Sequence, residues 1–295
     1  MLKNNCSIFA IGNFDGIHKG HQELLKVLQK VAKAEPYGVI TFEPHPVVFF
    51  KKVSNYLITK TADKINLLKS YGVSEIKVLP FNEIYQLSPE EFVEKILVNK
   101  LKVKTIVTGN NFTFGTKQLG NVTLLTAIAK KYNIKHIIVP FAKNRQGQVY
   151  SSSLVRQSIA LGDCASIYNL LGRNYIVSGI VVEGNKLARI LDFPTANIKL
   201  KDYVSPKYGV YAVYAIIDEV KYQGIANFGI RPTLTDHQEF LEVHIFNYNK
   251  NIYDKLIKVE FLKFIRNEMK FPSIELLKQQ ISKDVTTLKD YFAKQ

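Results

Sequence analysis

The chain has 295 residues, a length that fits two domains of about 150 residues each. Hydrophobic residues make up 46% and charged residues 22%, which excludes a disordered, fibrous or low-complexity protein. No apolar run reaches the roughly 18 residues that a membrane span needs, and the first residues do not resemble a signal peptide. We therefore expect a cytoplasmic protein with no membrane partner.

The charge is strongly positive. Lys and Arg total 40, Asp and Glu total 25, and the formal net charge is +15. Such a surface attracts nucleotides, nucleic acids or phosphorylated metabolites. The lysines are spread along the chain and form no basic stripe with interleaved aromatics, which favours a small anionic ligand over nucleic acid. Cys6 and Cys164 form no metal-ligand or disulfide pattern, so we expect both to be packing residues.

The first half alternates short apolar segments with amphipathic ones. Strands are expected at 6–12, 37–42, 75–79, 105–108 and 135–139, and helices at 20–34, 62–71, 89–99 and 123–132. Ser88, Pro89 and Glu91 predict a capped helix start with a capping box. The alternation predicts a parallel α/β sheet.

The pattern changes near residue 172. Strands are expected at 175–182, 209–217, 221–227, 240–246 and 256–264, with turn-forming residues between them. This indicates a small antiparallel barrel or sandwich. A terminal helix follows, with one apolar stripe made by Ile274, Leu277, Ile281, Val285, Leu288 and Phe292. We predict two domains, residues 1–172 and 173–295.

Residues 12–21 follow the first strand and open the first helix, where open parallel sheets bind ligands. A helix N-terminus offers free N–H groups to phosphate, and Gly20 would let the backbone approach a nucleotide closely. His18 and His21 lie three residues apart on one face, and both can donate to phosphate oxygens. Gly12 and Phe14 belong to the same candidate nucleotide loop. Metal binding by the two histidines is the rival, but no third ligand lies nearby in the sequence.

The segment His18-Lys19-Gly20-His21 resembles the signature of the nucleotidyltransferase superfamily. The resemblance implies a Rossmann-like sheet, and histidines that stabilise charge on the α-phosphate as pyrophosphate leaves.

Three further segments, 41–46, 108–115 and 151–156, each lie at an expected strand end or helix start. With them, the sequence resembles the bacterial bifunctional riboflavin kinase/FMN adenylyltransferase family, also called FAD synthetase. The resemblance implies nucleotide-binding roles for Asn111, Ser151, Ser152 and Ser153, where Ser153 replaces a family threonine and keeps a hydroxyl. Arg156 would supply a fixed positive charge and planar donors to phosphate.

The second half carries an independent resemblance to riboflavin kinases, through 193–197, 227–233 and 241–246. It implies that Thr195 and Asn197 hold Mg²⁺ and the ATP phosphates, and their hydroxyl and amide oxygens suit Mg²⁺. Glu242 aligns with the family's proposed catalytic base. In a strand, Glu242 and His244 would face one side, and Leu241, Val243 and Ile245 the other.

One segment departs from the family pattern. The loop 183–193 contributes Gly184 and Arg189 as candidate nucleotide ligands, but Ala188 and Asp192 stand where glycines are expected. A Cβ where the backbone needs positive φ costs affinity, and Asp192 adds negative charge beside an anionic ligand. Kinase activity is therefore less secure than adenylyl transfer.

The resemblance implies a bifunctional enzyme of flavin cofactor synthesis. It would phosphorylate riboflavin to FMN and adenylylate FMN to FAD, with ATP as substrate, Mg²⁺ as cofactor and pyrophosphate as product. We expect riboflavin, FMN and ATP as partners, no nucleic acid, and a monomer or weak homo-oligomer. Three alternatives stay open: an FMN adenylyltransferase with an impaired kinase domain, a nucleotidyltransferase acting on a pantetheine or nicotinate nucleotide, and a non-enzymatic nucleic-acid-binding protein.

Overall fold

The computed structural model describes residues 6–144, 146–183, 193–232 and 237–294. The chain divides into two compact units, Met1–Leu154 and Val155–Gln295. The division falls within helix α7 (Ser152–Leu161), upstream of the predicted boundary at residue 172. The turn after α7 belongs to the second unit, where Lys207, Phe264 and Tyr211 fill the space beside Gly162.

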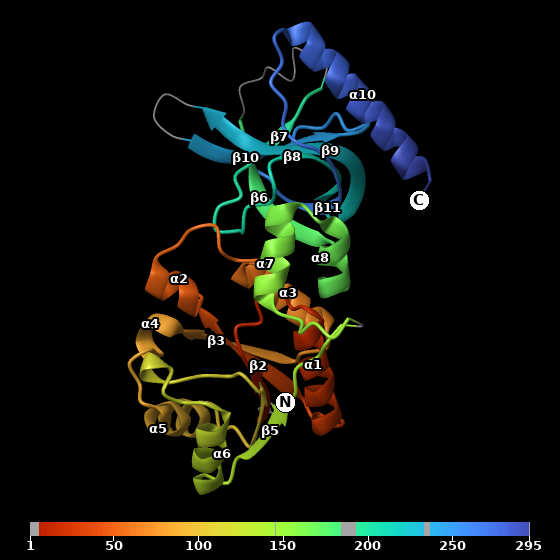
Figure 1. Ribbon diagram of the computed structural model, residues 1–295. Helices are drawn as coiled ribbons and strands as arrows, with labels where there is room; N and C mark the ends of the chain where they lie inside the picture. Colours follow the sequence, from red (N-terminus) through yellow and green to blue (C-terminus); the bar gives the residue numbers. More distant parts are fainter. Residues whose placement is uncertain (1–5, 145, 184–192, 233–236, 295) are drawn as a thin grey trace. The chain divides into compact units, whose positions relative to one another are not determined.

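The first unit holds a five-stranded parallel sheet of order β3-β2-β1-β4-β5, which confirms the predicted α/β class (Figure 1). Its strands are β1 (Ile8–Ile11), β2 (Tyr37–Glu43), β3 (Glu75–Pro80), β4 (Thr105–Gly109) and β5 (Lys135–Val139). Its longer helices are α1 (Lys19–Ala32), α3 (Thr61–Ser70) and α6 (Val122–Lys131).

The central strand β1 is buried on both faces. Ile8 and Ala10 pack with α1 and α3 in one apolar cluster, while Phe9 and Ile11 pack with α6 in another. All four side chains are buried. A strand covered by helices on both faces is the usual element of parallel α/β sheets, and its apolar run needs no alternation.

The local elements follow the predictions only in part. The capping box forms: Ser88 Oγ accepts from Glu91 N at 3.1 Å, and Ser88 N donates to Glu91 Oε2 at 2.9 Å. The helix predicted at 89–99 begins as α5 (Pro89–Glu91) and continues as a π-helix over Phe92–Lys100. Among the described residues, six elements were not predicted: α2 (Pro46–Lys51), α4 (Phe81–Ile84), a 3₁₀-helix over Thr116–Gln118, α7, α8 (Cys164–Leu171) and β7 (Ala196–Ile198).

The second unit is a closed antiparallel barrel of order β10-β7-β6-β11-β8-β9. Of the two architectures that the sequence indicated, the barrel is thus the one that forms. Its other strands are β6 (Tyr175–Val182), β8 (Gly209–Ile217), β9 (Val220–Pro232), β10 (His237–Ile245) and β11 (Leu256–Arg266). β9 pairs with β10, which closes the barrel. Asp218 and Glu219 join β8 to β9 with φ of 49° and 62°, the backbone that two-residue hairpins require.

The terminal helix α10 (Ile274–Ala293) packs on the barrel through the C-terminal part of its predicted stripe. Leu288 and Phe292 are buried against Val210 and Phe246. Ile274, however, is 52% exposed, so the N-terminal end of the stripe is not packed on the barrel. Among the described residues, no helix is long and apolar enough to cross a bilayer.

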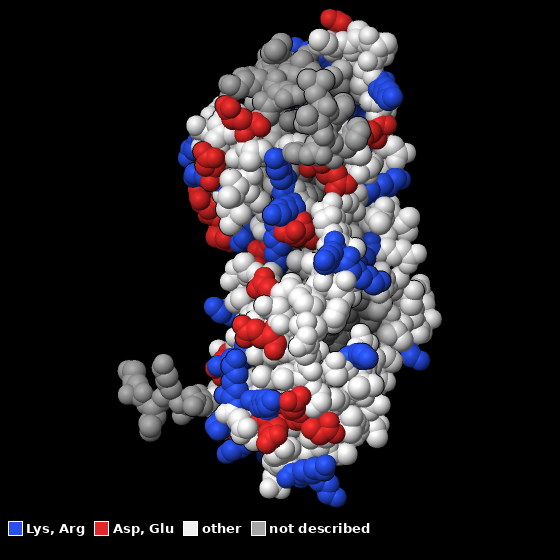
Figure 2. Space-filling view, turned by 90° about the vertical axis from the view of Figure 1, so that its left-hand side faces the viewer, with Lys and Arg blue, Asp and Glu red and all other residues white. Residues whose placement is uncertain are grey.

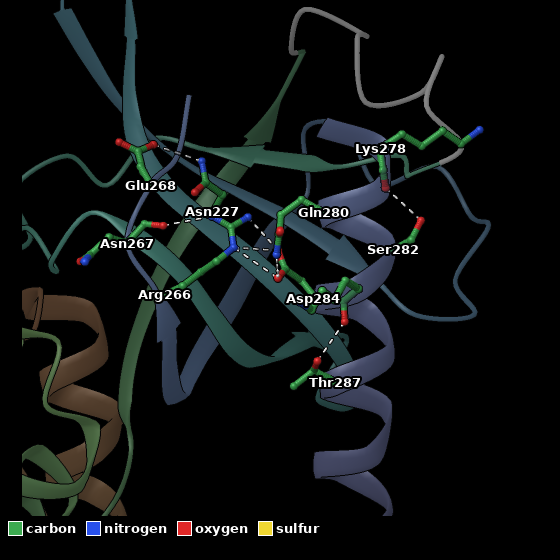
Figure 3. A network of polar contacts seen from close by, with 10 residues as sticks. Asn227, Arg266, Asn267, Glu268, Lys278, Gln280, Ser282, Asp284 and Thr287 are labelled. Carbon is green, nitrogen blue, oxygen red and sulfur yellow. Dashed lines mark hydrogen bonds and ion pairs between the residues drawn. The ribbon is translucent and has the colours of Figure 1, made fainter. Parts of the chain in front are cut away.

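A buried ion pair fixes the middle of α10 (Figure 3). Asp284 accepts hydrogen bonds from Arg266 Nη2 at 2.7 Å and from Arg266 Nε at 3.0 and 3.2 Å. Gln280 Nε2 also donates to Asp284, at 2.8 Å. The Asp284 side chain is only 6% exposed, so these donors replace the water that the carboxylate loses.

Replacing Asp284 with Asn should destabilise the second unit by about 3 kcal/mol, because Arg266 would keep its charge without a counter-ion. Urea unfolding followed by circular dichroism measures the change. Asp218→Asn is the matched control: it breaks the exposed pair with Lys255 and should leave the unfolding midpoint almost unchanged. Equal midpoints for both variants would contradict a stabilising role for the buried pair.

Candidate functional site

The first candidate site lies where the order of the parallel sheet reverses. β1 pairs with β2 on one side and with β4 on the other. The loops that leave β1 and β4 therefore start from neighbouring strand ends and diverge. Ligands of open α/β sheets bind in the crevice that such loops leave. The first loop carries His18 and His21, and the second carries Asn111.

A buried carboxylate shapes the loop after β1. Asp15 is 1% exposed, and it accepts hydrogen bonds from Ile58 N and Thr59 N, both at 3.0 Å. Phe14 and Ile17 have φ of 49° and 42°, which is costly for residues with a Cβ, above all for a β-branched one. We infer that the buried contacts of Asp15 hold the loop in this conformation.

A buried lysine supports the same loop from α3. Lys64 is 4% exposed, and its Nζ donates to the carbonyl of Asn13 at 3.1 Å and to Thr41 Oγ1 at 3.0 Å. Thr41 Oγ1 in turn donates to the Asn13 carbonyl at 3.1 Å. Burial lowers the pKa of Lys64, while Asp15 and Glu43 oppose that shift. A cation is thereby fixed beneath the turn that precedes the two histidines.

The two histidines stack at the start of α1. His18 caps the helix, since its Nδ1 accepts from His21 N at 3.3 Å. The ring centroids lie 3.8 Å apart with an interplanar angle of 19°. Because Nδ1 of His18 accepts, its neutral ring carries the proton on Nε2, which is therefore a donor. Both rings lie at the positive end of the helix dipole, where anions bind.

His21 is held neutral. Its pKa is well below the usual value, first because the ring is buried, then because of His18 and Lys64. Its Nδ1 is buried and has no hydrogen-bond partner in the described part of the chain. Nε2 is thus the nitrogen left to contact a ligand. Two neutral imidazoles would act on a phosphate as hydrogen-bond donors rather than as cations.

Gly12, Phe14 and Gly20 each have a structural role in this loop. A Cβ on Gly20 would lie 3.1 Å from the His18 ring and 3.3 Å from Tyr150 Cβ, so Gly20 makes room for the first histidine. Phe14 is fully buried and its ring lies 5.1 Å from that of His21. Gly12 continues the sheet, with its N–H donating to the Ile40 carbonyl at 3.1 Å. Contact of these three residues with a nucleotide stays a prediction.

The serine segment lies against the same loop. Ser152 Oγ donates to the Asp15 carbonyl at 2.8 Å, and Ser151 Oγ accepts from Leu154 N at 3.3 Å, which caps α7. Ser153 is exposed. Arg156 lies on α7, four residues after Ser152. The structure therefore brings Ser152 against the histidine loop, whereas nucleotide binding by 151–153 and by Arg156 stays a prediction.

An aromatic cluster, formed by Phe49, Phe50, Phe81 and Tyr85, lies on α2 and the segment around α4. Phe50 is 56% exposed, and its ring centroid lies 5.2 Å from that of Phe49 and 5.6 Å from that of Phe81. α2 follows β2 directly, at the same end of the sheet as the histidine loop. We did not predict this cluster from the sequence, although the Phe49-Phe50 pair after residues 41–46 was its visible signal.

The second candidate site is set by strand register in the barrel. Glu242 on β10 lies opposite Asn197 on β7 and opposite Asn227 on β9. Opposed residues in antiparallel pairs project from the same face of the sheet, so these three share one face. Leu241 and Val243 are buried on the other face, as the alternation predicts. The register therefore brings together Glu242 and the segment 195–197.

Thr195 and Asn197 lie side by side at the start of β7. Asn197 is buried and its Nδ2 donates to the Thr195 carbonyl at 3.3 Å. Asn227 Nδ2 donates to Glu268 Oε1 at 3.4 Å, which adds a second carboxylate near this face (Figure 3). Gly184 and Arg189, and the departures at Ala188 and Asp192, lie outside the described residues.

These features define a class of protein: an α/β nucleotide-binding domain with a nucleotidyltransferase-like histidine turn, followed by a six-stranded barrel with a polar face around a glutamate. Residues 2–153 match the family model described as FAD synthetase, and residues 171–292 match the one described as riboflavin kinase. The chain belongs to the bifunctional riboflavin kinase/FMN adenylyltransferase family.

Curated relatives match almost the whole chain. The bifunctional riboflavin kinase/FMN adenylyltransferase of Buchnera aphidicola from Schizaphis graminum is 40% identical, over 98% of this chain and 95% of its own. That of Haemophilus influenzae is 40% identical over 97% and 94%, and that of Escherichia coli K12 is 36% identical over 97% and 92%. A crystal structure of a macrolide-efflux protein from Streptococcus pneumoniae has a TM-score of 0.84 and 32% identity, and covers 96% of this chain and 94% of its own.

The lowered pKa of His21 predicts a pH-dependent stability. Between the usual histidine pKa and the lower folded value, the unfolded chain binds a proton that the folded chain does not, so wild-type stability falls as the pH drops. His21→Gln removes this loss. When the pH is lowered from about 7.5 to about 5.5, the free energy of unfolding should therefore fall by about 1 kcal/mol more in the wild type than in the variant. Urea unfolding at both pH values measures the difference, and a difference independent of pH would contradict a buried neutral His21.

Proposed function

We propose that the first domain transfers AMP from ATP to FMN and that the barrel phosphorylates riboflavin at its 5′-hydroxyl. The observation that carries this proposal is the match of each domain to its own family, together with a site of suitable chemistry in each. Both family matches lie in this one chain, and a relative named for both activities matches 98% of it.

In the first domain, the phosphate of FMN attacks the α-phosphate of ATP in line, and pyrophosphate leaves. His18 and His21 donate hydrogen bonds to the α-phosphate oxygens, where charge builds up in the transition state. The N-terminus of α1 adds its dipole, and Lys64 adds a fixed positive charge beneath the turn. Asn111, Ser151, Ser152, Ser153 and Arg156 bind the nucleotide.

In the barrel, Glu242 accepts the proton of the riboflavin 5′-hydroxyl as the oxygen attacks the γ-phosphate of a second ATP and ADP leaves. Thr195 and Asn197 hold the phosphates from the neighbouring strand β7. The opposed register of Glu242 and Asn197 keeps the base and the phosphate-binding segment on one face. Such chemistry depends mainly on positioning and charge neutralisation.

Mg²⁺ fits the residues of the barrel site. Thr195 offers a hydroxyl and Asn197 an amide oxygen, both hard oxygen donors of the kind Mg²⁺ takes together with water and phosphate. Within the described ranges, no group of three or more His, Cys, Asp or Glu residues could hold a metal alone, so the substrate phosphates would complete the shell. When bound, the ion would neutralise the charge of the transferred phosphoryl group.

The aromatic cluster is our proposed platform for the flavin ring of FMN in the first domain. Phe50 exposes a flat apolar face beside the end of β2, and an isoalloxazine ring is flat and largely apolar. Stacking of this kind typically contributes about 1 kcal/mol.

The alternatives make different predictions. An impaired kinase domain would convert FMN to FAD and leave riboflavin unchanged, and a transferase for pantetheine or nicotinate nucleotides would use neither flavin. A nucleic-acid-binding protein would need a basic surface. On the face in Figure 2, Lys and Arg alternate with Asp and Glu and form no continuous basic stripe. Steeply salt-dependent DNA or RNA binding without turnover would favour that last alternative.

His21→Ala and Glu242→Gln should separate the two activities. His21→Ala should lower FAD formation from FMN by about a hundredfold or more, because a transition-state donor is lost, while riboflavin phosphorylation stays near the wild-type rate. Glu242→Gln should lower phosphorylation by about a hundredfold or more and spare FAD formation. Chromatographic time courses from riboflavin and from FMN, each with ATP and Mg²⁺, measure both rates. Loss of both activities in one folded variant would contradict two separate sites.

Phe50→Ala should raise the KM for FMN in FAD formation by about fivefold, because a stacking face is lost, with little change in the KM for ATP. Phe50→Tyr keeps the ring and is the matched control. Initial rates at varied FMN and varied ATP measure both constants. An unchanged KM for FMN in Phe50→Ala would remove the cluster from the flavin site.

A further inference from the structure

The phosphate-binding segment of the barrel begins where a backbone ladder stops. β7 and β10 pair through Ile198 with Leu241, Asn197 with Glu242 and Ala196 with Val243. One step further, the ladder would continue to Thr195 and then to Pro194. Pro194 lies two residues beyond Ala196, outside this ladder, and it lacks the N–H through which a strand residue donates. Its carbonyl accepts from a side chain instead.

The side chain of His244 supplies that donor. His244 Nδ1 lies 2.9 Å from the Pro194 carbonyl, and since a carbonyl only accepts, Nδ1 carries the proton. The ring is fixed on both sides. Its centroid lies 5.4 Å from that of Phe193 at 84°, and 5.7 Å from that of Phe246 at 61°. Burial lowers the pKa of His244, with the Pro194 carbonyl opposing and Lys289 adding to the shift.

We propose that His244 is a positioning residue of the riboflavin kinase site, which holds the Pro194 carbonyl so that Thr195 is fixed beside Glu242. Thr195 lies between two anchors, the His244 bond on one side and the β7–β10 ladder on the other. Glu242 and His244 project from the same face of β10, two residues apart. One strand thus carries both the base and the clamp on the phosphate-binding segment. The inference rests on the proposed kinase function of the barrel.

The test uses three substitutions in the full-length chain. In Asn, the amide nitrogen occupies the branch position of the histidine Nδ1, so His244→Asn keeps the donor. His244→Gln places its amide one bond further out, near the Nε2 position, and His244→Leu has no donor. The KM for ATP in riboflavin phosphorylation should rise about tenfold in the Gln and Leu variants, and stay within about threefold of wild type in the Asn variant. FAD formation from FMN should be unchanged in all three.

Two outcomes would overturn the proposal: a KM for ATP equal to wild type in all variants, or Asn at least as impaired as Leu in folded protein. A purely packing role predicts the second result, because Leu fills the space better than Asn. A measurement on the wild type needs no variant: carbon-13 shifts of labelled histidine should show the Nδ1–H tautomer at His244, and the Nε2–H tautomer would also overturn the proposal. A wild type without kinase activity would instead refute the proposed function, while the tautomer would still report the hydrogen bond.

Discussion

The backbone groups at the ends of strands need hydrogen-bond partners, and both candidate sites are built by the side chains that provide them. In the first domain, β1 ends at Ile11 and the chain turns sharply into α1. The Asn13 carbonyl accepts hydrogen bonds from Lys64 and Thr41, and the Asp15 carbonyl accepts one from Ser152. An unpaired buried carbonyl would cost about 1–3 kcal/mol, so these donors make a costly turn stable.

The barrel meets the same constraint in a different way. The strand β7 is only three residues long, and its start is marked by a proline that cannot extend the ladder. A single imidazole, that of His244, takes the place of the missing backbone pair. In both domains the candidate ligand-binding segment is therefore held by side chains from distant parts of the chain. Such support fixes the position of a loop without using the side chains of the loop itself.

The sequence allowed much of this fold to be predicted, because most of its signals are local. Alternation of apolar segments located the five parallel strands, and the period of two placed Glu242 opposite the buried face of β10. The capping box at Ser88 depends on residues three apart and was predicted correctly.

The features that we missed depend on contacts between residues far apart in the chain. From the sequence alone, Lys64 is indistinguishable from an ordinary surface lysine of an amphipathic helix. Only the packing of α3 against the loop after β1 buries it. Asp284 lies at the edge of the apolar stripe, four residues before Leu288, and nothing in the local sequence identifies Arg266 on β11 as its partner. β7 is too short to show a period at all, and its pairing with β10 is what defines it.

The chemistry of the two substrates explains why the two sites carry different residues. The attacking group in FAD formation is a phosphate. Its second pKa is about 6, so it is ionised at neutral pH and the site needs no base. It needs donors and positive potential, which the two neutral histidines, the helix N-terminus and Lys64 provide. Asp15 lies in the same loop, but its carboxylate accepts from Ile58 and Thr59 and so serves the fold. The attacking group in FMN formation is an alcohol, which must lose a proton to attack. In the proposed assignment the carboxylate of Glu242 would take this proton in the barrel, and a negative charge of that kind would be a disadvantage in the other domain.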